Sequence, residues 1–176
     1  FMLEEDGRVE EELYKEYTAL GLSNPPKITH TSSEAEALSL LDRLSFDLVI
    51  TMLDFHTGRV EKLAEKIKII KPTMPVIVLA PSPDHRRVKN LKEDNKKNID
   101  YLFYWQGNPS LFLAMVKLIE DSLNLEHDTS EADVQVIILI EDSVRFISSY
   151  LPKMYTCLIH QARNSILEAL NEWGKT

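Results

Sequence analysis

The sequence has a single cysteine, Cys157, among its 176 residues. One thiol cannot form a disulfide within the chain, and without a cluster of cysteines and histidines there is no ligand set for structural zinc. Only five glycines are present, and none lies in a glycine-rich loop of the kind that holds phosphates. These absences exclude a disulfide-rich secreted domain and favour a reducing, cytoplasmic compartment.

Long apolar runs are also scarce. The longest strongly apolar stretch, residues 134–140, has about a third of the ~20 residues that a membrane-spanning helix needs. Acids outnumber bases, with 28 Asp and Glu against 20 Lys and Arg and a net charge of −8. Nucleic-acid phosphates favour basic surfaces. We therefore expect neither a membrane segment nor a nucleic-acid partner, and the local basic cluster within 86–97 indicates a solvated helix face or a protein-docking surface.

Three short apolar runs stand apart from longer periodic segments, at residues 48–53, 76–79 and 101–105. Their hydrophobicity is continuous rather than alternating, which is typical of strands buried on both faces of a parallel sheet. A weaker strand is predicted over 27–30. The segments between these strands have helical periodicity, and this alternation indicates βαβ units in a doubly wound α/β fold.

Apolar stripes predict the helices between the strands. A stripe from Val9 to Leu20 predicts a helix that Gly21 ends. Thr31 and Glu34 form a capping-box pattern before the next stripe. Further stripes cover residues 60–70, closed by a proline, and 111–119.

An internal repeat organises the chain. Residues 1–9 (FMLEEDGRV) align with residues 138–146 (ILIEDSVRF). Both passages are an apolar strand ending in two acids, followed by a helix with arginine at the same offset. We therefore predict a first domain over 1–124 with a short first strand, an acidic linker over 125–133, and over 134–176 the first strand and long helix of an incomplete second domain. Pro152 is expected to bend that helix.

Four separated motifs together resemble the bacterial response-regulator receiver family over about 120 positions. They are the acidic pair Glu4 and Glu5 and the passages 47–52, 75–80 and 100–102. The resemblance implies a flavodoxin-like parallel sheet with strand order 2-1-3-4-5, followed here by an extra strand and a long C-terminal helix. Receivers accept a phosphoryl group on an aspartate at the end of the third strand, with Mg²⁺ held between carboxylates.

The residues that match the receiver's reactive positions lack its chemistry. The acceptor position is Met52, the switch hydroxyl falls on Ala80, and the lysine falls on Tyr104. A thioether is neither the phosphoryl nucleophile nor a hard ligand for Mg²⁺, alanine has no hydroxyl, and tyrosine carries no positive charge. The resemblance therefore implies a pseudo-receiver with no catalytic residue and no required cofactor.

Three sets of acidic residues are candidates for phosphorylation or for Mg²⁺ binding. Asp54 lies two residues beyond the acceptor position and is either a displaced acceptor, which would make the chain an active phosphorelay receiver, or a solvated loop carboxylate. Glu4 and Glu5 could still hold Mg²⁺ weakly, although the third carboxylate is missing. Glu141 and Asp142 match the acidic metal pair of the incomplete second receiver.

The passages 3–22, 105–107, 126–128 and 141–152 are similar to the amino-terminal region of bacterial multidomain proteins of the phosphoenolpyruvate synthase and pyruvate phosphate dikinase type. In that family, tandem receiver-like domains precede a nucleotide-binding catalytic part. The resemblance implies that this chain is not itself an enzyme but a regulatory module for protein contact in a signalling or phosphotransfer protein. The apolar surface of the long C-terminal helix predicts a homodimer, in which the last strand and helix either pack against the partner or are exchanged.

Overall fold

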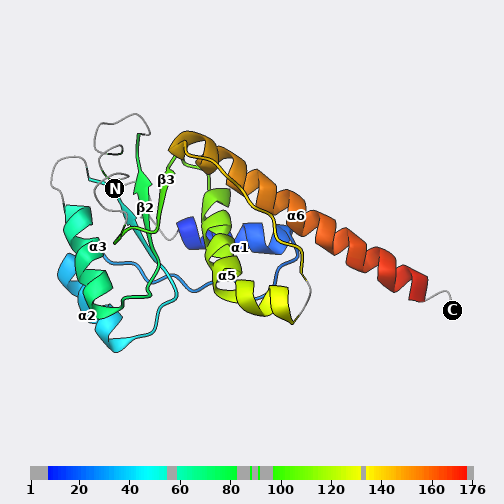
Figure 1. Cartoon of the computed structure of the whole chain (residues 1–176), viewed down its shortest axis with the longest axis horizontal. Coiled ribbons are helices and arrows are strands. Elements are labelled where there is room, and N and C mark those ends of the chain that lie inside the picture. Colours follow the sequence, from blue (N-terminus) through cyan, green and yellow to red (C-terminus); the bar gives the residue numbers. More distant parts are fainter. Residues whose placement is uncertain are drawn as a thin grey trace. The chain divides into compact units, whose positions relative to one another are not determined.

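A computed structural model describes residues 8–54, 59–82, 88, 91, 97–131 and 134–173 (Figure 1). The elements in chain order are α1 (Arg8–Ala19), α2 (Glu34–Arg43), β1 (Val49–Met52), α3 (Arg59–Ile70), β2 (Val76–Ala80), β3 (Tyr101–Tyr104), α5 (Ser110–Ser130) and α6 (Val144–Trp173). The fold is mixed α/β, as predicted. Internal contacts divide the described residues into a sheet unit, 28–108 with 126–148, and a helical unit, 8–27 with 109–125 and 149–173.

The sheet unit is built around β2. The three strands are parallel in the order β1-β2-β3, with Val49 opposite Val76 and Ile77 opposite Tyr101. All five residues of β2 have essentially no exposed surface, because strands flank it on both edges and side chains cover both faces. The three predicted parallel strands are confirmed, and of them only β2 is buried along its whole length. A five-stranded sheet is not seen in the described residues, and the strand predicted at 1–3 lies outside them.

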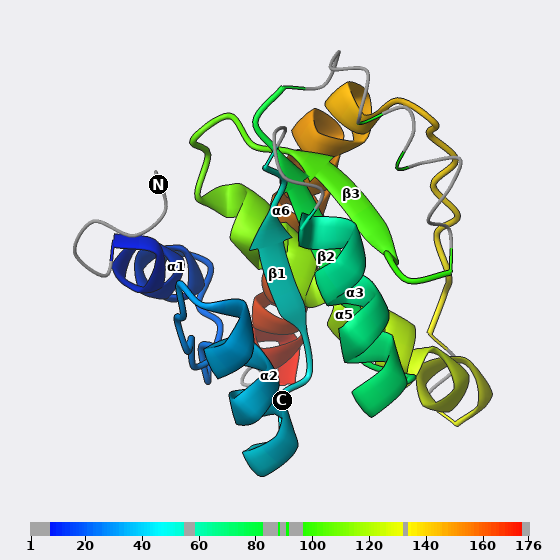
Figure 2. The same ribbon diagram turned by 90° about the vertical axis from the view of Figure 1, so that its left-hand side faces the viewer.

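Helices α2 and α3 lie side by side on one face of this sheet (Figure 2). Leu41 of α2 and Ile67 of α3 pack in one buried cluster with Val76 of β2. An ion pair between Lys66 and Glu34 joins the two helices at 2.6 Å, but both side chains are partly exposed. Pairs of that kind contribute at most about 1 kcal/mol, so the apolar cluster rather than the ion pair holds the helices in place.

The start of α2 differs from the predicted capping box. The N-cap is Ser33, whose side chain accepts a hydrogen bond from the backbone N–H of Glu36 at 3.5 Å. Thr31 instead donates to the carboxylate of Glu36 at 2.7 Å. The helix is therefore capped two residues later than predicted, because Ser33 and Glu36 repeat the Ser/Thr-x-x-Glu spacing of Thr31 and Glu34. The N–H of Ser33 donates to the hydroxyl of Thr31 at 3.2 Å rather than to Glu36.

The helical unit begins with α1, whose predicted stop at Gly21 is confirmed. Gly21 has a φ of +68°, the left-handed conformation that favours glycine. Its N–H donates to the carbonyl of Thr18 at 3.0 Å, and the N–H of Leu22 donates to that of Tyr17 at 2.8 Å. These two bonds define a Schellman motif and satisfy carbonyls that the helix end would leave unpaired.

Three predicted segments differ from the structure. Residues 125–130, predicted as linker, are the last turns of α5, because acidic and polar residues on an exposed face are compatible with helix. Residues 134–140 and 27–30, predicted as strands, pair with no strand of the described residues. Ile28 is the sole large apolar residue in the second of these, too little to hold a strand in a sheet. Helix α6 continues through Pro152.

No helix of the described residues is both long enough and apolar enough to cross a membrane.

Asp100 ties the amino ends of β2 and β3 together. Its carboxylate accepts hydrogen bonds from the backbone N–H of Val76 at 2.7 Å and from the Lys68 ammonium at 2.8 Å. Its own N–H donates to the carbonyl of Val76 at 2.9 Å. The Lys68 side chain is only 14% exposed, so this pair is better shielded than the surface pairs.

We expect Asp100→Ala to lower the free energy of unfolding by about 1–3 kcal/mol, because it leaves a buried N–H without an acceptor. Asp100→Asn keeps an acceptor for that N–H and should cost less. Urea unfolding followed by circular dichroism measures both. Asp42→Ala, at an exposed position of α2, is the control and should stay within about 0.5 kcal/mol. Equal losses in all three variants would contradict the assigned role.

Tyr17 is a buried phenol of the helical unit. It is 2% exposed, its hydroxyl has no hydrogen-bond partner among the described residues, and the Lys117 ammonium lies 5.4 Å from its ring centre. Burial, with a smaller contribution from the negative charge of Glu120, raises the pKa of Tyr17 from 10.0 to about 12. The folded chain therefore keeps this proton at pH values where the unfolded chain loses it.

The contribution of the raised Tyr17 pKa to the free energy of unfolding is thus fully present below pH 10.0 and is lost as the pH rises to about 12. Over this interval the free energy of unfolding of the unchanged chain should fall with rising pH. In Tyr17→Phe, which has no phenol to titrate, this slope should be shallower by up to about 1.4 kcal/mol per pH unit. Urea unfolding at a series of alkaline pH values measures the slope. Tyr14→Phe, at an exposed tyrosine of the same helix, is the matched control. Identical slopes for both variants would show that Tyr17 does not titrate as described.

Candidate functional site at the carboxyl ends of the strands

The parallel sheet brings to one edge the three positions that the sequence resemblance matches to a receiver's reactive residues. Met52, Ala80 and Tyr104 each end a strand, and the strands are neighbours. Ala80 lies opposite Tyr104 in the ladder, while Met52 lies opposite the residue before Ala80. Parallel strands necessarily align their carboxyl ends, which is why residues far apart in sequence meet there. The described side chains at these positions supply a thioether, a methyl group and a phenol.

An apolar cluster packs around two of these positions, Ala80 and Tyr104. Ala80 is fully buried and packs with Leu53, which follows β1, and with Val144, the first residue of α6. Tyr104 is half-buried against the same cluster. The start of α6 therefore helps to cover the carboxyl end of the sheet with methyl and methylene groups. Such a lining does not suit a phosphoryl group or a hydrated metal ion, both of which need polar partners.

Ser148 closes the outer side of β3. It is the one buried polar residue of the described chain, at 6% exposure. Its hydroxyl accepts a hydrogen bond from the backbone N–H of Tyr104 at 2.7 Å and donates to the carbonyl of Val144 at 2.5 Å. The hydroxyl is thus fully engaged with backbone groups, and it satisfies an edge N–H that would otherwise be left without an acceptor.

Of the acidic candidates, Asp54, Glu141 and Asp142 lie in the described residues and do not form a metal-binding group there. Asp54 is exposed just beyond β1. The carboxylate of Glu141 accepts a hydrogen bond from the backbone N–H of Ser143 at 2.8 Å, in the turn before α6, and Asp142 is exposed. Glu4 and Glu5 lie outside the described residues. Within the part of the chain that is described, no three His, Cys, Asp or Glu side chains are placed to hold a metal ion.

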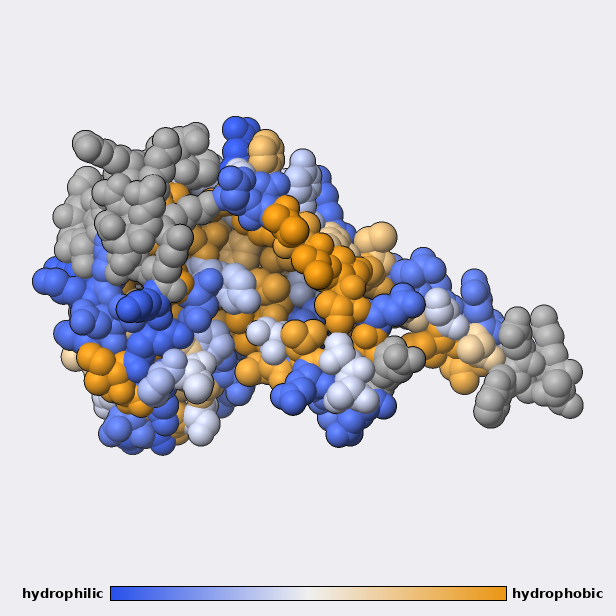
Figure 3. Space-filling model, viewed as in Figure 1, coloured by the Kyte–Doolittle hydropathy of each residue, from blue (hydrophilic) through white to orange (hydrophobic). Residues whose placement is uncertain are grey.

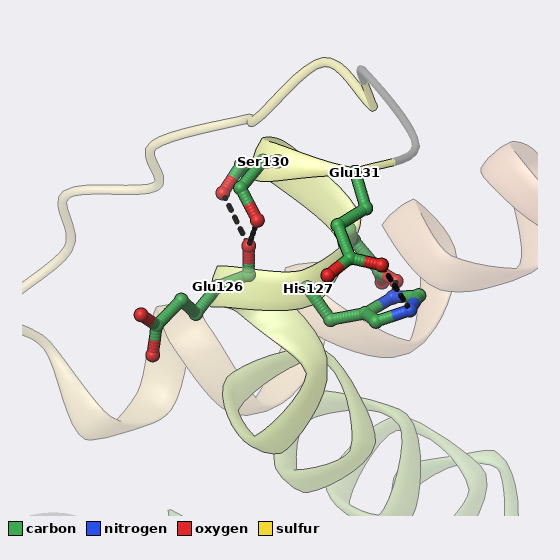
Figure 4. A network of polar contacts seen from close by, with 6 residues as sticks. Glu126, His127, Ser130 and Glu131 are labelled. Atoms are coloured by element: carbon green, nitrogen blue, oxygen red, sulfur yellow. Dashed lines mark hydrogen bonds and ion pairs between the residues drawn. The ribbon is translucent and has the colours of Figure 1, made fainter.

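A polar network at the end of α5 has a structural explanation (Figure 4). Nδ1 of His127 lies 3.4 Å from Oδ1 of Asp128, and Nε2 of His127 lies 3.4 Å from Oε2 of Glu131. The hydroxyl of Ser130 donates to the carbonyl of Glu126 at 2.6 Å. His127 is 68% exposed, so these contacts are surface pairs of small energy. The serine bond satisfies a carbonyl near the helix end.

Comparison with known proteins does not assign the chain to a family. No protein-family model matches the sequence, and no curated protein matches it.

Sequence reasoning found the three strand-end positions but missed Ser148 and the role of Asp100. Ser148 lies 44 residues from the N–H that it satisfies, and a lone serine in a helical stripe gives no signal of such a contact. Asp100 was part of a motif carrying the resemblance, but its bond to Val76 depends on the parallel pairing of β2 and β3. Only the assembled sheet reveals either role.

We expect Ser148→Ala to lower the free energy of unfolding by about 1–2 kcal/mol, because the N–H of Tyr104 then loses its acceptor. Urea unfolding measures the loss. Ser165→Ala is the matched control, since Ser165 also donates to the carbonyl four residues earlier but is exposed. Its cost should be near zero. A Ser148 loss no larger than the Ser165 loss would contradict the proposed role of this hydroxyl at the sheet edge.

Proposed function

We propose that the chain is a receiver-like regulatory module that does not accept a phosphoryl group and that acts through protein–protein contact and oligomerisation. The proposal includes the cytoplasmic setting and the larger signalling or phosphotransfer protein that the sequence resemblances imply. In such a protein the phosphotransfer chemistry, on pyruvate or phosphoenolpyruvate, would belong to another part. The module itself is not an enzyme.

The observation that carries the proposal is the chemistry of the aligned strand ends. The parallel order β1-β2-β3 is the order that strands 3, 4 and 5 have in a receiver sheet. Phosphoryl transfer needs a nucleophile and groups that offset the charge developing on the phosphoryl oxygens. Met52, Ala80 and Tyr104 supply neither a carboxylate nor a cation. The apolar cluster beside them makes a metal-bound phosphoryl group unfavourable at that edge.

Exposed apolar residues support a role in contact. On α6, Phe146, Tyr150, Ile166 and Leu170 are each at least half exposed. Exposed apolar surface on this scale usually marks an interaction site. A homodimer in which the C-terminal helix contributes to the interface is therefore part of the proposal.

A second candidate function rests on Asp54. This carboxylate is exposed at the same end of the sheet, two residues beyond Met52. It would serve as a displaced acceptor in an active phosphorelay receiver, with Mg²⁺ bound by Glu4 and Glu5.

Intact mass spectrometry after incubation with acetyl phosphate and Mg²⁺ separates the two functions. We expect no added phosphoryl mass, while an active receiver treated in parallel is labelled. A single adduct that Asp54→Asn abolishes and Asp42→Asn leaves in place would contradict the proposal and establish Asp54 as the acceptor. Asp42 is suited to this control because it is an exposed carboxylate on α2.

A further inference from the structure

The segment between α5 and α6 presents a strand-like sequence to solvent. Residues 134–140 read VQVIILI, and the six apolar side chains are between 44% and 90% exposed. Ile138 and Ile140 are the most exposed large apolar residues of the described chain, at 82% and 90%. Apolar side chains lie along the surface there, over the connection from α5 to α6 (Figure 3). Leu139 and Ile137, on alternate positions, are also exposed, so neither face of the segment is covered.

The outer edge of β1, the side away from β2, offers the matching backbone groups. Val49 and Leu53 donate their N–H groups toward β2, to the carbonyls of Pro75 and Leu79, at 2.9 and 2.7 Å. Because successive N–H groups of a strand point to opposite sides, Ile50 and Met52 direct theirs to the outer edge. No described strand lies there. All four β1 residues are only half-buried, whereas every residue of β2 is buried.

The opposite edge of the sheet is less accessible. There the outward N–H of Tyr104 already donates to Ser148, and Val144 packs against the same strand ends. The start of α6 thus closes the carboxyl half of the β3 edge. At the β1 edge, by contrast, the outward N–H groups have no strand partner among the described residues.

We infer that residues 134–140 of one copy add as a parallel strand to the outer edge of β1 in a second copy. A continuous apolar run is typical of a strand buried on both faces of a parallel sheet, which is the setting this edge would provide. Both copies carry a strand and an edge, so the exchange is reciprocal and closes as a two-fold dimer. The inference rests on the proposed oligomerisation and specifies the two surfaces that meet, residues 134–140 and the outer edge of β1.

The competing occupant of this edge within one chain is the passage 1–3. It aligns with residues 138–140 in the internal repeat. An edge filled in this way would exclude residues 134–140 of a second copy. Variants of the segment and of the edge, alone and mixed, therefore decide between the two occupants.

Light scattering on the full chain and on two variants tests the inference. The full chain is expected to have a dimer mass at micromolar concentration. Ile138→Lys/Ile140→Lys charges the strand, and Ile50→Pro removes an outward N–H that β2 does not use. Each variant alone should be monomeric. Mixed together they should give a dimer, because one intact strand then meets one intact edge.

Controls separate this contact from other associations. Leu123→Lys/Leu125→Lys removes exposed apolar side chains of α5 and should leave the dimer intact. Circular dichroism confirms folding of each variant, and Met52→Pro replaces Ile50→Pro if the latter does not fold. A monomeric full chain, a dimer that survives the Ile138/Ile140 variant, or folded monomeric variants that do not restore a dimer on mixing would each overturn the inference. None of these results depends on phosphorylation, so the proposed lack of phosphoryl acceptance is tested separately.

Discussion

The complete burial of β2 is the constraint on which the sheet unit depends. Val76 to Ala80 have no exposed surface, and their backbone groups cannot be satisfied by water. They must therefore be satisfied by strands on both sides, and β1 and β3 take those places. Since all three strands run in parallel, their carboxyl ends meet at one edge. The candidate site is a consequence of this arrangement rather than a separate feature.

The elements that the sequence predicts well are those whose signal is local. Continuous apolar runs identified all three strands, and Gly21 marked the end of α1 through its own backbone preference. The capping of α2 was displaced from Thr31 to Ser33 because neighbouring hydroxyl residues are equally suited to it. For residues 134–140, apolar character predicts a strand, yet a strand also needs a paired edge, and no sequence pattern specifies where that edge lies.

The candidate site also has a part that the sequence predicts and a part that it does not. The positions of Met52, Ala80 and Tyr104 at strand ends could be predicted from the motifs, and the sheet brings these residues to one edge. What surrounds them could not be predicted, because Val144 and Ser148 come from a helix that begins 40 residues after the end of β3. Long-range contacts of this kind are set by packing, for which a single sequence gives no periodic signal.

The uncharged side chains at the strand ends are compatible with the covering of this edge by the start of α6. A site that binds a phosphoryl group and Mg²⁺ must keep charged groups hydrated or paired, and burying them unpaired is costly. With a thioether, a methyl group and a phenol at these positions, that cost disappears, and apolar residues such as Val144 can pack against the edge. The apolar covering in turn offers a charged intermediate no polar partner from Val144 or Ala80. Under the proposed function, the module therefore has one constitutive state of this edge, and regulation must act through its exposed apolar surfaces.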